Sequence, residues 1–164
     1  MSGVFARGEL PRLSIAVQRP VPIRVLTNSR PGRALGLPGM LPNVLGVIAI
    51  HEQAYARAQV WYSECLLFAR EIGKYTAFAK CLVGFAGIAN AGKSFERAAR
   101  LVGAAGAELE TRKIHLETNF DRAELQRLTT ILRDELGEAR FDELADEGRT
   151  ITLEQAIQYA LEKK

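Results

Sequence analysis

The amino-acid sequence predicts an all-α fold built from antiparallel helix pairs and a C-terminal helical tail. All six prolines fall between Pro11 and Pro42, and proline blocks helix interiors, so residues 43–164 are free to form helices. Apolar side chains in this part recur at spacings of three and four, the period of an amphipathic helix rather than of a strand. With 48% hydrophobic and 25% charged residues among 164, we expect one globular domain.

Residues 1–40 differ in composition from the rest of the chain. They contain six arginines and a single acidic residue, Glu9, whereas residues 41–164 carry 16 basic and 18 acidic side chains. Five prolines and five of the 14 glycines also lie in this stretch, which predicts a mostly irregular arm. We expect no nucleic-acid partner beyond weak contact through this basic arm. We also expect a cytoplasmic protein without a membrane partner, because no run of 18 apolar residues is present.

Two helix pairs are predicted first, with helices over Val44–Gln53, Ala56–Ile72 and Thr76–Ala91 and a fourth beginning at Ser94. Gly73 should end the second helix, because glycine readily adopts the left-handed conformation found at helix C-termini. The Ser94 hydroxyl should cap the free amides of the fourth helix. The apolar faces of the second and fourth helices are predicted to hold Trp61, Cys65, Phe68 and Ile72, and Phe95, Ala98, Leu101, Val102 and Ala105, respectively.

The C-terminal part, residues 111–164, is predicted to form three capping helices after an irregular stretch over Thr111–Thr118. The first helix opens at a capping box formed by Asp121 and Glu124 and ends at Gly137. The second covers Glu138–Glu147, with Phe141 and Leu144 facing inward and Gly148 as its end. The last begins at a second capping box, Thr152 with Gln155, and buries Leu153, Ala156, Ile157, Ala160 and Leu161.

The two helix pairs superpose when the first is aligned with the second, with small residues on small ones and aromatic residues on aromatic ones. Leu45 then falls on Phe85, Gly46 on Ala86, Tyr55 on Phe95, Arg57 on Arg97 and Ala58 on Ala98. The pattern resembles the tetratricopeptide repeat, and Tyr62 in the first unit and Leu82 and Ala105 in the second also fit it. Pro42 departs from that pattern, and the 40-residue period exceeds the usual 34. The resemblance implies two helix-turn-helix repeats within residues 41–110.

A second resemblance is carried by the strings Glu96–Ala105, Leu136–Gly148 and Leu153–Leu161. They are similar to the C-terminal ends of large bacterial multidomain regulators, including LuxR-type transcriptional regulators and regulators linked to ATPase or cyclase modules. In those proteins the helical repeats form a sensing or partner-binding tail. The resemblance implies that this chain is a tail or fragment of a larger regulator, and that it binds another protein or domains outside this chain.

Stacked helix pairs leave a concave groove lined by the first helix of each pair. The sequence therefore predicts a non-enzymatic module for protein–protein or intramolecular regulatory binding, without a cofactor or a metal ion. The groove is predicted to be lined by Asn43, Val47, Ile50 and His51 from the first pair and by Lys80, Val83 and Asn90 from the second. That two repeats form too small a groove and only cap further repeats remains an open alternative.

A second alternative is a small nucleotide-binding protein, because Gly87–Ser94 matches the phosphate-binding pattern G-x-x-x-x-G-K-[ST]. In that hypothesis Gly87 and Gly92 shape the loop, Lys93 reaches the terminal phosphates and Ser94 binds magnesium. Such a loop needs a parallel sheet behind it and an acidic residue at the end of a second strand. The downstream sequence is helical, so we favour the interpretation that Gly87 lies within a helix and that Gly92 and Lys93 form a turn.

Other reactive side chains do not form a recognisable site. His51 and His115 lie far apart in the sequence without partners at metal-ligand spacing. Cys65 and Cys81 do not form a C-x-x-C motif and are predicted to be buried as small apolar side chains. No nucleophile with a nearby base is evident, so no catalytic residue is predicted.

The repeat predicts that Ala98→Leu destabilises the protein by roughly 1–3 kcal/mol, because a larger side chain cannot be housed where two helix backbones approach closely. Ala58→Leu, at the equivalent position of the first pair, should behave similarly. Ala104→Leu is the control that the apolar pattern suggests, since Ala104 should lie off the buried face. Urea unfolding of the variants beside the parent checks this, and equal midpoints for Ala98→Leu and the parent would contradict the repeat register.

Overall fold

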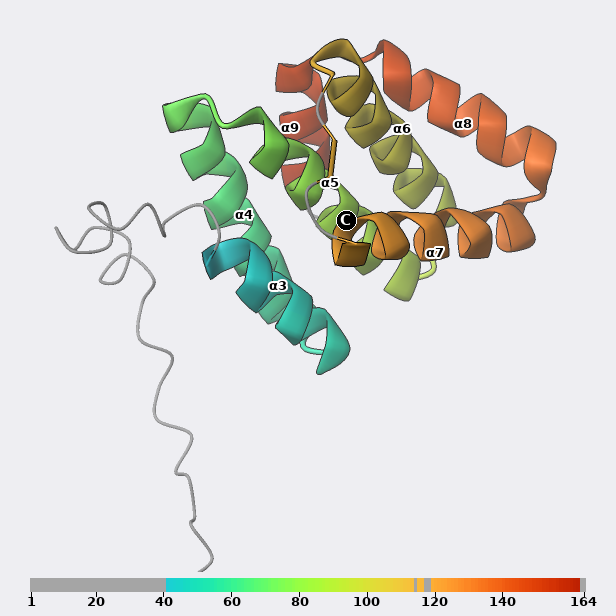
Figure 1. Cartoon of the computed structure of the whole chain (residues 1–164). Coiled ribbons are helices and arrows are strands. Elements are labelled where there is room, and N and C mark those ends of the chain that lie inside the picture. Colours follow the sequence, from blue (N-terminus) through green and yellow to red (C-terminus); the bar gives the residue numbers. More distant parts are fainter. Residues whose placement is uncertain (1–40, 114, 117–118, 163–164) are drawn as a thin grey trace, which may run out of the picture.

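The computed structural model describes residues 41–113, 115–116 and 119–162, in which all regular structure is α-helical (Figure 1). The predicted arm, residues 1–40, and part of the stretch expected to be irregular lie outside the described residues. The all-α prediction is confirmed for the described residues, which contain seven helices and no strand. The helices are α3 (Leu41–His51), α4 (Tyr55–Ile72), α5 (Tyr75–Ala91), α6 (Phe95–Thr111), α7 (Asn119–Leu136), α8 (Glu138–Thr150) and α9 (Leu153–Leu161).

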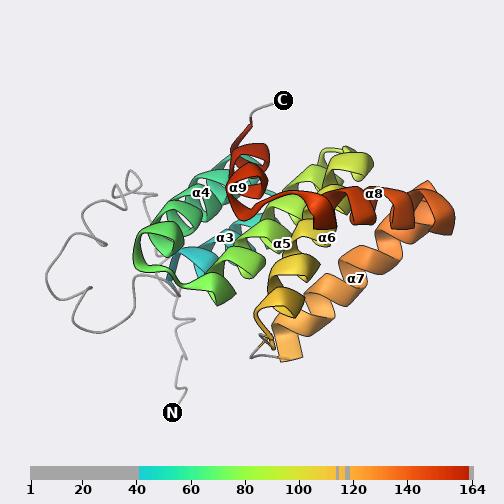
Figure 2. The same ribbon diagram turned by 90° about the horizontal axis from the view of Figure 1, so that it is seen from above.

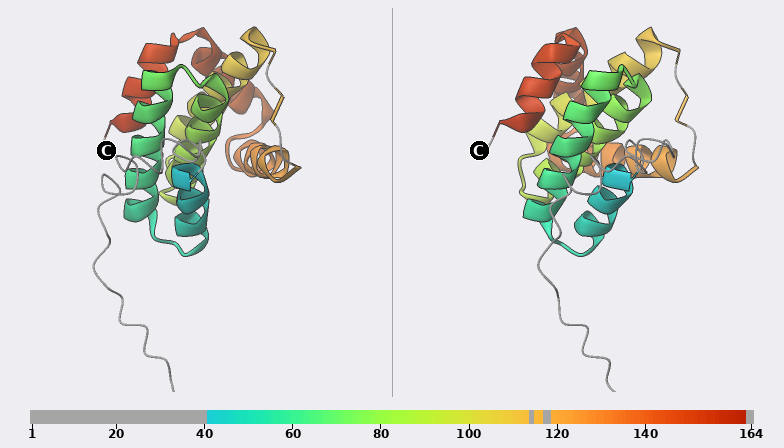
Figure 3. Two further views of the ribbon diagram at one scale, coloured as in Figure 1. Left: turned by 60° about the vertical axis from the view of Figure 1, so that its left-hand side comes forward. Right: turned by 90° about the vertical axis from the view of Figure 1, so that its left-hand side faces the viewer.

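Helices α3 to α6 lie side by side as consecutive antiparallel neighbours, as the view from above shows (Figure 2). Helix α8 packs along α6, and α9 covers parts of α5 and α6. Helix α7 is oriented differently, because it is seen nearly end-on in the left view of Figure 3 while α3, α4 and α5 run along the plane of the picture. No helix in the described residues is long and apolar enough to cross a membrane.

The turns after α3, α4 and α5 share one backbone geometry and recur at a regular interval along the chain. Gln53, Gly73 and Lys93 each have a positive φ, of 57°, 68° and 58°. The amide of the next residue bonds back to the carbonyl of a buried alanine five residues earlier. These bonds are Ala54 N to Ala49 O (2.8 Å), Lys74 N to Ala69 O (2.9 Å) and Ser94 N to Ala89 O (2.8 Å). Each turn is followed at once by an aromatic first helical residue, Tyr55, Tyr75 or Phe95.

Several predicted helix ends are wrong, for identifiable reasons. Helix α3 begins at Leu41 and includes Pro42, which is tolerated because the first helical turn needs no amide donor there. Helix α7 begins at Asn119, so Asp121 lies in its first turn rather than at its N-cap. Ser94 precedes α6 but its side chain makes no capping hydrogen bond. By contrast, the capping box of Thr152 and Gln155 is confirmed.

Gly148 was expected to end a helix but lies inside α8, where it allows a close approach to α6. A Cβ at Gly148 would overlap the backbone carbonyl of Arg100, and one at Gly103 of α6 would overlap that of Ala145. Two glycines on facing helices therefore bring the α6 and α8 backbones into contact. Ala104, next to Gly103, is only 3% exposed, so the prediction that it lies off the buried face is wrong.

The apolar face of α4 is also rotated from the prediction. The buried residues of α4 are Ala58, Tyr62, Cys65, Leu66 and Ala69. Of the predicted face, Trp61 and Phe68 are half-buried and Ile72 is 51% exposed. Ala98 and Ala58 are fully buried, as the predicted destabilisation of their leucine variants requires. Because Ala104 is buried, the control for these variants becomes Ala123→Leu, at a solvent-exposed position of α7.

Lys93 occupies a left-handed position that costs a non-glycine residue about 1–2 kcal/mol. We therefore expect Lys93→Gly to stabilise the protein by about 1 kcal/mol, part of the gain being offset by the greater freedom of glycine in the unfolded chain. Lys74→Gly is the matched control, because Lys74 has a φ of −88° and glycine relieves no strain there. Urea unfolding measures both, and a Lys93→Gly variant no more stable than the parent would contradict the strained turn.

Candidate functional site

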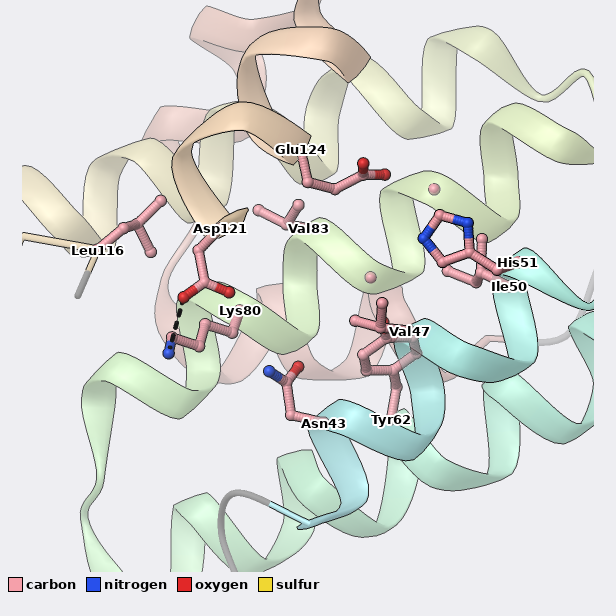
Figure 4. Close-up of a pocket in the computed structure, with 12 residues that line it drawn as sticks. Asn43, Val47, Ile50, His51, Tyr62, Lys80, Val83, Leu116, Asp121 and Glu124 are labelled. Carbon is pink, nitrogen blue, oxygen red and sulfur yellow. Dashed lines mark ion pairs between the residues drawn. The ribbon is translucent and has the colours of Figure 1, made fainter. Parts of the chain in front are cut away.

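The predicted groove residues line a pocket above the middle of α5, with α3 forming one wall and α7 the other (Figure 4). Six of the seven residues predicted from the sequence line it: Asn43, Val47, Ile50, His51, Lys80 and Val83. The structure adds six lining residues that the prediction did not include: Tyr62, Gly84, Gly87, Leu116, Asp121 and Glu124. Side chains from two predicted repeat units and from the C-terminal helices thus meet in one place.

The pocket is a small slot with apolar sides. Its cavity volume is about 30 Å³, which is enough for at least one water molecule. Val47, Ile50 and Val83 contribute carbon atoms to it, and Asn43 and His51 stand at opposite ends of its α3 wall. A slot with apolar sides suits an aliphatic group rather than a charged one.

The ring of Tyr62 sets the spacing of the helices around this slot. Tyr62 belongs to α4, is 2% exposed, and passes between Gly46 of α3 and Gly84 of α5. A Cβ at Gly46 would lie 2.6 Å from Cζ of Tyr62, and one at Gly84 would lie closer still. The two glycines therefore leave the space that the ring fills. Burial raises the pKa of Tyr62 above its ordinary value, so the phenol stays neutral.

Ion pairs hold the α7 wall in place and neutralise the charges around the slot. Lys80 Nζ on α5 lies 2.9 Å from Asp121 Oδ2 on α7, and their side chains are only 17% and 14% exposed. Such a partly buried pair is costly to break, because either charge alone would be left without its partner. It therefore fixes the start of α7 against the middle of α5.

Glu124, one turn further along α7, is paired within its own helix. The Arg127 guanidinium donates to both carboxylate oxygens of Glu124, at 3.0 and 2.7 Å. This hydrogen bonding holds the pKa of Glu124 below its usual range, with a smaller electrostatic contribution from His51. Glu124 and His51 reach toward each other from opposite walls (Figure 4). The slot is thus bordered by charges that are already compensated.

Asn90, the seventh predicted groove residue, does not line the slot. It lies on α5 three residues beyond Gly87, and therefore on the same side of that helix. Its Oδ1 is buried and accepts no hydrogen bond from the described residues. Asn90 is therefore an acceptor beside the groove whose hydrogen-bonding capacity the described chain does not use.

The segment Gly87–Ser94, which matches the phosphate-binding pattern, does not direct free backbone amides toward a ligand. Gly87 lies within α5, and Gly92 and Lys93 form the turn to α6, as the favoured interpretation predicted. The amides of Gly92, Lys93 and Ser94 donate to carbonyls of the preceding turn at 3.0, 2.9 and 2.8 Å. A phosphate loop needs such amides directed at the ligand, so this segment is arranged as a helix end.

The remaining reactive side chains are dispersed or buried. Cys65 and Cys81 are fully buried, as predicted, and hydrogen-bond to each other between α4 and α5. Burial raises the pKa of the Cys81 thiol well above its ordinary value. His51 and His115 are exposed, and within the described ranges no three potential metal-ligating side chains lie together.

No protein-family model, curated protein or solved structure matches this chain. The resemblances to tetratricopeptide repeats and to the tails of bacterial regulators therefore stay predictions.

The sequence did not reveal the α7 wall. Lys80 and Asp121 are joined only by the packing of α7 on α5, and Asp121 had a sufficient local explanation as a helix cap. Gly84 and Tyr62 also carry no sequence signal for their contact, because a glycine in a helix and a tyrosine one helix earlier have many possible partners. The opposite charges of Lys80 and Asp121 are the kind of signal that could have suggested that α7 packs against α5.

Two alanine substitutions in α5 should have opposite effects on stability. Gly84→Ala should destabilise the protein by roughly 1–3 kcal/mol, because the added methyl collides with the buried Tyr62 ring. Gly87→Ala should stabilise it by about 0.5–1 kcal/mol, because alanine favours helix and its Cβ meets only Ile50 Cδ1, at 3.4 Å.

Gly106→Ala in α6 is the matched control, since its Cβ would lie 3.7 Å from the Arg149 guanidinium, an ordinary contact. It should be stabilising to a similar degree. Urea unfolding of the three variants decides, and a Gly84→Ala variant as stable as Gly87→Ala would contradict the position of Tyr62.

Proposed function

We propose that this chain is a non-enzymatic, tetratricopeptide-like binding module that holds a segment of a protein partner in the groove between α3, α5 and α7. The observation that carries the proposal is the convergence of six predicted groove residues on one slot. The repeat predicts this convergence, because the first helix of each repeat should line a concave face.

The regular turns support a repeat of helix pairs. Gln53 and Lys93, which end α3 and α5, are equivalent in the register that aligns Tyr55 with Phe95, and they share the left-handed conformation. Gly73 and Lys113, which end α4 and α6, are equivalent in the same register and also share it. The pairs α3–α4 and α5–α6 therefore end in turns of the same kind, which supports the proposed repeat, although α3, at 11 residues, is shorter than the 17 residues of α5.

The chemistry of the groove favours binding over catalysis. Its lysine is paired with Asp121 at 2.9 Å and its glutamate with Arg127, so neither is poised to transfer a proton. None of the described residues lining the slot is a serine, threonine or cysteine that His51 could activate. The partner would be another protein or, if the chain is part of a larger regulator, a segment of that regulator.

The test is a selection of 12-residue random peptides displayed against the full chain, followed by mapping of the bound peptides by amide chemical-shift changes. Peptides bound in the groove should shift Asn43, His51, Lys80 and Val83. Val47→Arg should lower their affinity at least tenfold by placing a charge in the apolar slot. Leu67→Arg, at an exposed position of α4 outside the groove, is the matched control and should leave it unchanged.

Shifts confined to other surfaces, or a selection that yields no peptide bound in the groove, would overturn the proposal. Circular dichroism of Val47→Arg establishes that the variant is folded. If Val47→Arg does not fold, the chemical-shift map on the parent chain still tests whether peptides bind in the groove.

A further inference from the structure

Helices α4 and α5 form an antiparallel hairpin whose register is fixed by a close contact. The ring of Tyr62 on α4 lies against Gly84 on α5, and each of these residues is 11 positions away from Gly73 in the connecting turn. Cys65 and Cys81 are each eight positions away from Gly73. They therefore lie level with each other, about one helical turn nearer to the connecting turn than the Tyr62 contact.

The two thiols face each other in the interior between these helices. Both side chains are fully buried, and the Cys81 thiol donates a hydrogen bond to the sulfur of Cys65. A single buried cysteine is ordinarily a small apolar side chain. Here both cysteines of the chain lie in contact, so the pair brings together the two sulfur atoms that a disulfide needs.

Small residues on both sides of the pair let the helix backbones come together. Gly84 has no side chain to separate the helices in the layer of Tyr62. Ala69 and Ala77, each four positions away from Gly73, are buried in the layer nearest the turn. A disulfide needs Cα atoms about 4.4–6.8 Å apart, and closely packed helices with small residues at their contact permit that spacing.

We propose that Cys65 and Cys81 are a redox pair, and that a peroxide converts them into a disulfide that joins α4 to α5 in the folded protein. The bond makes the hairpin a closed loop over residues 65–81. This inference goes beyond the proposed function, because it needs neither a partner nor the repeat.

Cys65 is the thiol that reacts first. The hydrogen bond from Cys81 lowers the pKa of Cys65, and the charges of Lys74 and Lys80 act in the same direction. Burial raises the pKa of Cys81 well above its ordinary value. Because the thiolate is the nucleophile, Cys65 attacks the oxidant and Cys81 completes the bond.

The reaction balances with hydrogen peroxide as the oxidant. The Cys65 thiolate attacks one peroxide oxygen and the O–O bond breaks, which leaves a sulfenic acid on Cys65 and a hydroxide that takes up the proton lost by Cys65. The sulfur of Cys81 then attacks the sulfur of the sulfenic acid. The S–S bond forms, and the departing hydroxide takes the Cys81 proton as water. The two thiols thus lose two electrons, and the peroxide is reduced to two waters.

Burial of both sulfur atoms controls the rate of this reaction and the lifetime of its product. A peroxide reaches them only when the hairpin opens locally, so oxidation of the folded chain is slow. Ile72 and Tyr75, on either side of the turn, are 51% and 37% exposed, so the hairpin has little cover at this end. Once the disulfide has formed, the same burial shields it from reducing thiols.

The disulfide acts on the slot through Tyr62. Cys65 follows Tyr62 by three residues on α4, and Cys81 precedes Gly84 by three on α5. A covalent bond between the sulfur atoms therefore moves the helices about one turn from the ring. Because the ring lies between Gly46 and Gly84, oxidation should shift the amide NMR signals of both glycines. Unchanged signals in the oxidised chain would contradict this effect on the slot.

The test treats the folded full chain with hydrogen peroxide for several hours and maps its tryptic peptides by mass spectrometry. Trypsin cuts after Arg57, Arg70, Lys80 and Lys93, so the two cysteines lie in separate peptides, 58–70 and 81–93. These peptides should become linked within one chain and separate again after reduction. The cysteine peptides are the readout because peroxide also oxidises methionine.

Single-cysteine variants are the matched controls. In Cys81→Ala, the peptide with Cys65 should gain oxygen atoms, because the second thiol is missing. In Cys65→Ala, Cys81 should stay reduced at least tenfold longer than Cys65 does in Cys81→Ala. Circular dichroism establishes that both variants fold, and the peptide map of the parent decides if they do not.

Two results for the parent would overturn the proposal. In the first, the folded chain stays reduced under conditions in which the same chain, unfolded in urea, forms the linked peptides. In the second, Cys65 or Cys81 gains oxygen atoms without becoming linked to the other. Neither result bears on the binding of peptides in the groove, so the proposed function is tested separately.

Discussion

The packing of one aromatic ring against two glycines determines the geometry of this molecule's groove. Tyr62 projects from α4 between Gly46 on α3 and Gly84 on α5, and neither glycine could carry a Cβ without colliding with the ring. The ring therefore acts as a spacer of fixed thickness between three helices. If it were displaced, α3 and α5 would change their separation, and the slot between Val47, Ile50 and Val83 would close or widen.

Contacts of other kinds complete the frame around this spacer. The partly buried pair of Lys80 and Asp121 fixes α7 against α5, so the second wall depends on electrostatics and the first on packing. Further from the groove, Gly103 and Gly148 bring α6 and α8 into backbone contact.

Local signals in the sequence were sufficient for much of the fold, and contacts between distant helices account for the rest. Thr152 and Gln155 satisfy each other within a single helical turn, so their capping box was predictable. Gly148 was misassigned because a glycine that ends a helix and a glycine that admits a neighbouring backbone are identical in sequence. The α3 and α5 sides of the site were predicted from the proposed repeat register, whereas Asp121 and Glu124 reach the site through packing of α7 that no local pattern encodes.

The position of the Tyr62 ring between α3 and α5 is tested most directly by the nuclear Overhauser effects from that ring in the full chain. If the ring separates α3 from α5, its protons must show strong cross-peaks to the α-protons of both Gly46 and Gly84, because both helix backbones lie against it. Cross-peaks to both glycines would establish the spacing on which the groove depends. A Tyr62 ring with contacts to only one of them, or to neither, would contradict the account.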